Sequence, residues 1–136
     1  MKTITDKASL SQFLEDVEQL QDALLHEAIL IHPGYIAGNR DMFGHGELPD
    51  AILIFQSQFQ NVAAVQLKLK QVSVFNLDFS RDFEFQGEFS KDGIVLYPAG
   101  KEWAASTKIQ ASAAEYSILD ANFLGSQYRF INQGSS

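Results

Sequence analysis

Apolar and polar residues alternate through most of residues 51–89, which is the two-residue period of half-buried β-strands. The same stretch holds seven of the eleven Phe residues of the chain. Alternation puts these Phe side chains on one face of a sheet and Gln, Lys and Glu on the other. We therefore expect a meander of antiparallel strands with an aromatic face, at residues 50–60, 63–70, 72–79 and 83–89.

An amphipathic helix precedes the meander. Ser9 with Gln12 three residues later matches a capping box, which predicts a helix over residues 9–20 with Ser9 as its N-cap. A helix this short is not stable alone, so its apolar face must pack on the sheet. The apolar positions follow the three-and-four spacing of one helix face: Leu10, Phe13, Leu14, Val17 and Leu20.

A first strand and a long loop lie between the helix and the meander. Residues 25–32 are rich in Ile and Leu and stop at Pro33-Gly34, which predicts a strand. Residues 35–49 are rich in Gly and other turn formers, which predicts a loop. Loops of this length are often functional, so the loop is the first place to look for a site.

The last third of the chain continues the sheet. Asp92-Gly93 predicts a hairpin turn before a strand at residues 94–97. Residues 107–119 fit either a strand with a bulge or a short Ala-rich helix. Residues 123–131 fit a last strand.

These elements predict an α+β fold in which an N-terminal helix packs on a mostly antiparallel β-sheet of six to eight strands. We expect the sheet to be curled into a sandwich or half-barrel. At 136 residues the chain fits a single domain, 1–136.

Composition narrows the class of protein. The formal net charge is −7 and the pI is about 4.8, which argues against nucleic acid and anionic membranes as partners. The chain has no Cys, so disulfides and thiol catalysis are excluded. The N-terminus has no apolar signal segment, and no apolar run approaches the roughly 18 residues that span a bilayer. We therefore expect a cytoplasmic protein.

The histidines offer the only metal-type chemistry. His26 and His32 would lie roughly 20 Å apart on one strand, too far to share an ion. A site would have to pair His32 with His45, with oxygen ligands supplied by Glu47, Asp41 or Asp50. The alternative is a hydrogen-bonded histidine beside a turn. We predict no metal and no cofactor.

No other motif predicts a catalytic residue. The chain lacks a phosphate-binding loop and a nucleophile elbow. The Phe run could line a ligand pocket, but alternate Phe residues more often form plain core. Tyr97 and Trp103 flank a loop containing Pro98, and an exposed Trp or Tyr there would be a contact residue for a partner.

One resemblance bears on function. Leu25-His26-Glu27-Ala28, the strand at residues 49–55 and the meander resemble a group of small acidic bacterial proteins of unknown function. Some of those are similar to immunity proteins of toxin systems. Glu27 stands where Asp is usual in the group. The resemblance implies no catalytic residues and favours a non-enzymatic binding protein.

The leading hypothesis is a protein-binding module, with a protein partner or a second copy (a homodimer) as its target and an immunity-type inhibitor as its concrete form. The alternative is a small-molecule pocket or a hydrolytic enzyme that uses the 35–49 loop. An enzyme would require His45, Glu47 and Asp50 to converge on one pocket. Residues 51–55 are apolar on both strand faces, so this strand must be internal or covered on its second face.

Overall fold

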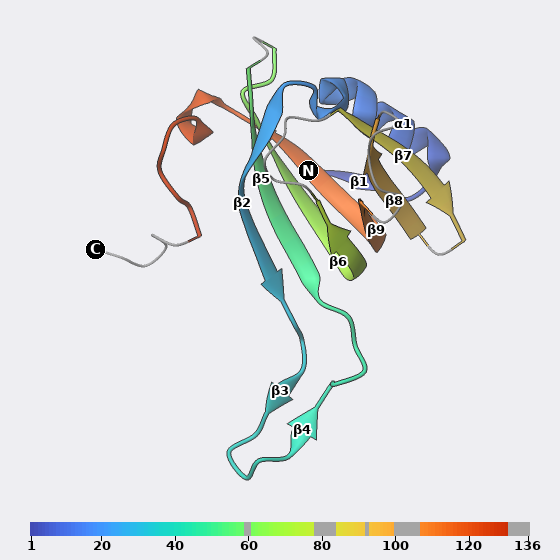
Figure 1. Cartoon of the computed structure of the whole chain (residues 1–136), viewed down its shortest axis with the longest axis vertical. Coiled ribbons are helices and arrows are strands. Elements are labelled where there is room, and N and C mark those ends of the chain that lie inside the picture. The colour runs from blue at the N-terminus through green and yellow to red at the C-terminus, as the bar shows by residue number, and fades with distance from the viewer. Residues whose placement is uncertain (59–60, 78–83, 92, 100–106, 131–136) are drawn as a thin grey trace.

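The computed structural model describes residues 1–58, 61–77, 84–91, 93–99 and 107–130. A main sheet is formed by seven strands, each antiparallel to its neighbours, in the order β2-β5-β6-β9-β8-β7 with β1 beside β9 (Figure 1). Its strands are β1 (Lys2–Ile4), β2 (Ala23–Ile31), β5 (Asp50–Ser57), β6 (Ala64–Asn76), β7 (Phe85–Ser90), β8 (Gly93–Pro98) and β9 (Lys108–Leu119).

The predicted α+β class and antiparallel sheet are confirmed, but the predicted sandwich or half-barrel is wrong. The sheet is neither closed nor strongly curled. Its two ends, β2 and β7, do not pair with each other. A helix covers one face of the sheet, and an irregular segment covers part of the other face. The apolar core is therefore buried without closure of the sheet. None of the described helices is long and apolar enough to cross a membrane.

Helix α1 (Lys7–Asp16) begins earlier than the sequence pattern predicts. Asp6, not Ser9, is the N-cap, and Ser9 occupies the third helical position. The Asp6 carboxylate accepts from the Ser9 backbone N–H at 2.7 Å, and the Ser9 hydroxyl accepts from the Asp6 N–H at 3.0 Å. A capping box therefore exists, but it lies three residues upstream of the predicted one. A short 3₁₀ turn, η1 (Glu18–Leu20), follows.

The helix and the sheet share one apolar core. Phe13 is fully buried and meets the ring of Tyr116 edge-on, with ring centroids 4.8 Å apart. Phe55 of β5 and Phe85 of β7 also pack edge to face, at 6.0 Å. Leu14 is half-buried at the margin of this core. Burying this face against the sheet is what stabilises so short a helix.

Strand β6 corrects the predicted meander. The sequence indicated two strands with a turn near Gln71, but the chain runs straight on, and both halves pair with β9. Gln71 has a φ of 51°, which lets the inward positions shift from Leu69 to Val72 without a turn. Strand β9 shifts in the same place, from Ala111 to Ala114. Residues 108–119 are thus a strand and not a helix.

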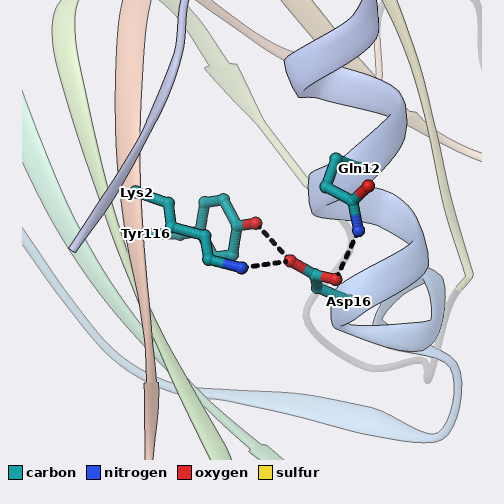
Figure 2. Close-up of polar contacts among 4 residues, drawn as sticks. All are labelled: Lys2, Gln12, Asp16 and Tyr116. Atoms are coloured by element: carbon teal, nitrogen blue, oxygen red, sulfur yellow. Dashed lines mark hydrogen bonds and ion pairs between the residues drawn. The ribbon is translucent and has the colours of Figure 1, made fainter.

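A polar cluster ties the helix to the sheet (Figure 2). The hydroxyl of Tyr116 donates to the Asp16 carboxylate at 2.6 Å, and the Gln12 amide and Lys2 ammonium donate to the same group. These hydrogen bonds, that of Tyr116 first, lower the pKa of Asp16. Burial and the Asp16 charge raise the pKa of Tyr116. The cluster joins the C-terminal end of α1 to β9 and β1.

The C-terminal segment, residues 120–130, lies over the face of the sheet opposite the helix. It holds a 3₁₀ turn, η2 (Ala121–Phe123), and then irregular backbone, so the predicted last strand is wrong. The Gln56 amide donates to the carbonyls of Phe123 and Gly125, at 3.0 and 2.8 Å. The Phe130 N–H donates to the buried Glu27 carboxylate at 2.9 Å.

This segment explains why β5 is apolar on both faces. Leu53 and Phe55 face the helix, whereas Ile54 faces away from it and is nevertheless buried. Ile54 is paired with Glu27 in the β2–β5 ladder. Strand β5 is also internal, between β2 and β6. Its second face is thus covered by the chain itself.

Candidate functional site

A hairpin projects from the main sheet between the end of β2 and the start of β5 (Figure 1). Two short strands, β3 (Tyr35–Ile36) and β4 (Met42–Phe43), form it by antiparallel pairing. We call residues 33–48 the arm. The sequence predicted a long loop here, and the structure shows that its two sides are paired. The large apolar side chains of the arm are all exposed: Tyr35, Ile36, Met42, Phe43 and Leu48.

The arm is held in shape by its backbone. At its tip, the Ala37 N–H donates to the Asp41 carbonyl and the Arg40 N–H donates to the Ala37 carbonyl, both at 2.8 Å. Farther down, the two sides approach so closely that a Cβ on Gly34 would lie 2.8 Å from the carbonyl oxygens of Phe43 and Gly44. Only glycine fits this crossing without displacing the opposite chain.

The base of the arm is attached to β6. The Asp50 carboxylate accepts from the Gln71 N–H at 3.0 Å, and the Val72 N–H donates to the Pro49 carbonyl at 2.7 Å. These bonds fix where β5 begins. The arm therefore leaves the sheet from a defined point, although its outer part has few contacts with the body.

The two histidines of the arm region line the same hollow, which their predicted acidic partners do not line. His32 and His45 line one hollow of about 320 Å³ together with Tyr35 and Phe43. Glu47 lines a second hollow, of about 630 Å³, with Asp50 and Lys70. The convergence of His45, Glu47 and Asp50 that an enzyme would require is therefore not seen.

The geometry of His32 fits the alternative of a histidine beside a turn. Its Nδ1 accepts from the Gly34 N–H at 2.8 Å, so the neutral ring carries its proton on Nε2. Within the described ranges, no three His, Cys, Asp or Glu side chains lie close enough together to hold a metal ion. The hydrogen bond ties the His32 side chain to the backbone at the start of the arm.

The other predicted contact residues lie elsewhere. Tyr97 is on β8, half-buried, and its hydroxyl donates to Glu88 at 3.3 Å. Burial, together with the Glu88 charge, raises the pKa of Tyr97. Trp103 lies outside the described residues. Tyr97 lines neither hollow of the arm region, so the five predicted site residues that the structure describes do not form one site.

An acidic hollow of about 570 Å³ lies beside the helix, and the sequence reasoning did not predict it. Glu15 and Glu18 line it, with Ser11, Leu14, Gln19 and Gln21. The signal was present in the acidic face of the helix, which is ordinarily a solvated surface. This hollow gives the body of the molecule a negative surface that is separate from the apolar arm.

No protein-family model, curated protein or solved structure matches this chain. Its function must therefore be inferred from the arm and from the charges around it.

Proposed function

We propose that this chain is a non-enzymatic protein-binding module that contacts its partner through the arm. The exposed apolar side chains of the arm carry the proposal. Tyr35 is 61% exposed and Met42 is 60% exposed. The rings of Tyr35 and Phe43 stack on each other at 5.2 Å and leave their outer surfaces in water. Clustered apolar side chains of this kind mark interaction sites.

The shape of the arm supports the same function. A hairpin that extends from a sheet can insert into a groove of a partner, and its backbone is already ordered by β3–β4 pairing. Less conformational entropy is therefore lost on binding than with a disordered loop. Aromatic side chains and Met are the residues that most often dominate such contacts.

The concrete form that we propose is an immunity-type inhibitor of a basic toxin. The net charge of −7 would speed the encounter with a basic protein, and the acidic hollow at Glu15 and Glu18 lies on the body near the start of β2, whereas the arm follows the end of β2. The arm would supply the apolar contact and the body the electrostatic attraction. The sequence resemblance to immunity proteins favours this form.

A binding titration tests the proposal. The probe is a basic protein encoded beside the gene of this chain, titrated calorimetrically against the native chain and against a Tyr35→Ser, Met42→Ser double variant. We expect tight binding by the native chain and a loss of at least tenfold in the double variant, since each lost hot-spot side chain is worth about 1–2 kcal/mol. Ile118→Ser is the control, because Ile118 is also an exposed apolar residue, at 49%, but lies on β9.

Equal affinity in the native chain and the arm variant would refute the arm as the contact surface. Loss in the Ile118→Ser control as well would place the contact on the sheet instead.

A second candidate function is a small-molecule site in the hollow between His32 and His45. Its volume of about 320 Å³ is at the lower end of ligand sites, and two imidazoles line it. If it is a hydrolytic site, the native chain should cleave an activated ester faster than a His45→Ala variant does. Equal rates would exclude hydrolysis of that substrate by His45.

A further inference from the structure

Strand β2 is an edge of the main sheet that lacks the usual protection. It pairs with β5 on one side, and in the described part of the chain no strand pairs with its other side. Its nine residues include no Lys, Arg or Pro. Natural proteins use these residues, short strands or a covering element to stop edges from pairing. The opposite edge, β7, is shorter, carries Glu88 and is packed against α1.

The free part of β2 is its second half. A register shift between Leu25 and Glu27 interrupts the ladder, and the ring of His26 is stacked on Tyr128 of the C-terminal segment at 5.0 Å. Beyond this point the ladder with β5 is regular through Ile31. The first half of the strand thus contacts the C-terminal segment, whereas no strand in the described part of the chain pairs with the outer edge of residues 28–31.

This half is apolar on both faces. Ala28 and Leu30 lie on the helix side of the sheet, where α1 does not reach, and both are exposed. Ile29 and Ile31 lie on the opposite face. Leu30 and Ile31 are each 52% exposed. An uncharged strand end with both faces apolar is unusual at a sheet edge in water.

The backbone groups along the outer edge of β2 determine what can bind there. Its outward N–H and C=O groups alternate along the strand, and the complement of such a row is another β-strand. A second β2 is suited to the role, because antiparallel pairing about a two-fold axis joins a strand to itself. Two chains of net charge −7 repel, but residues 28–31 place no charge in the contact.

We propose that β2 pairs antiparallel with β2 of a second copy, which doubles the seven-stranded sheet into one continuous sheet across a two-fold axis. The helix-side faces of the two copies lie on the same side of the joined sheet only if the two-fold axis passes next to one residue of β2. An axis between two residues would pair positions that belong to opposite faces. The regular half of β2 then centres the contact on Ile29 or Leu30. Leu30 lies opposite Ala28 or Leu30 of the second copy, so the two Leu30 side chains are direct or diagonal neighbours.

This inference does not depend on the proposed function. Because the paired strands run in opposite directions and each arm follows β2, the two arms leave the joined sheet at opposite ends. A dimer would thus present two arms to two partner molecules.

Variants that introduce a positive or a negative charge at Leu30 test the pairing. Light scattering after size exclusion, at micromolar concentration, should give the native chain twice its 15.2 kDa mass. Leu30→Lys and Leu30→Glu should each give a single-chain mass, because like charges then face each other. An equimolar mixture of the two variants should regain the doubled mass, which a variant that merely failed to fold would not do.

Ile36→Lys in the arm is the control that separates this contact from the proposed arm function. It should keep the doubled mass. A native mass of 15.2 kDa throughout the micromolar range would overturn the inference. So would a doubled mass that survives both Leu30 variants, or one that is lost in Ile36→Lys and kept in Leu30→Lys.

Discussion

Two aromatic pairs of similar spacing lie in opposite surroundings. Phe13 and Tyr116 meet at 4.8 Å between the helix and β9, and both are buried. Tyr35 and Phe43 meet at 5.2 Å on the arm, and both are exposed. The contact between the rings is worth roughly 1 kcal/mol in either place. What differs is the apolar area removed from water, so the first pair stabilises the fold and the second remains available to a partner.

The largest expected effect comes from breaking the buried pair. Phe13→Ala should lower the free energy of unfolding by about 3–5 kcal/mol, through lost burial and the cavity that remains. Phe43→Ser is its matched counterpart in the arm and should change stability by less than about 0.5 kcal/mol. Urea denaturation of both variants measures the difference. Similar losses in the two variants would mean that the arm is part of the cooperative fold.

Tyr116→Phe should have an intermediate effect, because it keeps the buried ring and removes only the hydroxyl bond to Asp16. We expect a loss of about 1–2 kcal/mol at pH 7. The raised pKa of Tyr116 means that its contribution is complete below its ordinary pKa of 10.0 and declines as the pH rises above it. The lowered pKa of Asp16 means that its contribution is complete above its ordinary value of 3.8 and declines as the pH falls below it.

The native chain should therefore lose stability above about pH 10, and Tyr116→Phe should lose less of it over the same interval. Urea midpoints at pH 7 and at pH 10.5 measure this slope. Parallel slopes in the two proteins would show that Tyr116 does not keep its proton when folded.

A smaller and more local effect than that of Tyr116→Phe is expected at the crossing of the arm. Gly34→Ala places a methyl group 2.8 Å from two carbonyl oxygens of the opposite chain, so the sides of the arm must separate. Global stability should fall by about 1 kcal/mol or less, while amide exchange at residues 35 and 43 should rise several-fold. Gly38→Ala is the control, since nothing lies within 4 Å of its added Cβ. Equal exchange in both variants would contradict a close-packed crossing.

The sequence predicts well what local periodicity controls. The alternation around Leu67 and Leu69 gave the right inward face, and both are buried in the core. The helix was found but placed late, because Asp6 and Ser9 offer the same capping chemistry as Ser9 and Gln12. The positive φ of Gln71 cannot be predicted from the sequence, because glutamine is not a residue that favours this conformation. The sequence therefore predicts two strands where β6 is continuous.

Features that depend on distant contacts were missed. Nothing local shows that Phe130 returns to Glu27, because that contact is set by tertiary packing. The arm was read as a loop, since strands of two residues are too short to show alternation. Apolar pairs on both sides of the turn, Tyr35-Ile36 and Met42-Phe43, were the available signal. Of the predicted site residues, His32 and His45 line one hollow, and Glu47 and Asp50 line another.

The cover that the C-terminal segment places over β5 has a consequence for the order of folding during synthesis. The hydrogen bond between Glu27 and Phe130 joins residues 103 positions apart, and that between Asp16 and Tyr116 spans 100. Contacts of this separation form slowly, because a long loop must close first. During synthesis on the ribosome, Ile54 in the paired strands β2 and β5 therefore stays exposed to water until residue 130 has been made. During that interval this pair of strands is the segment most exposed to mispairing with another nascent chain.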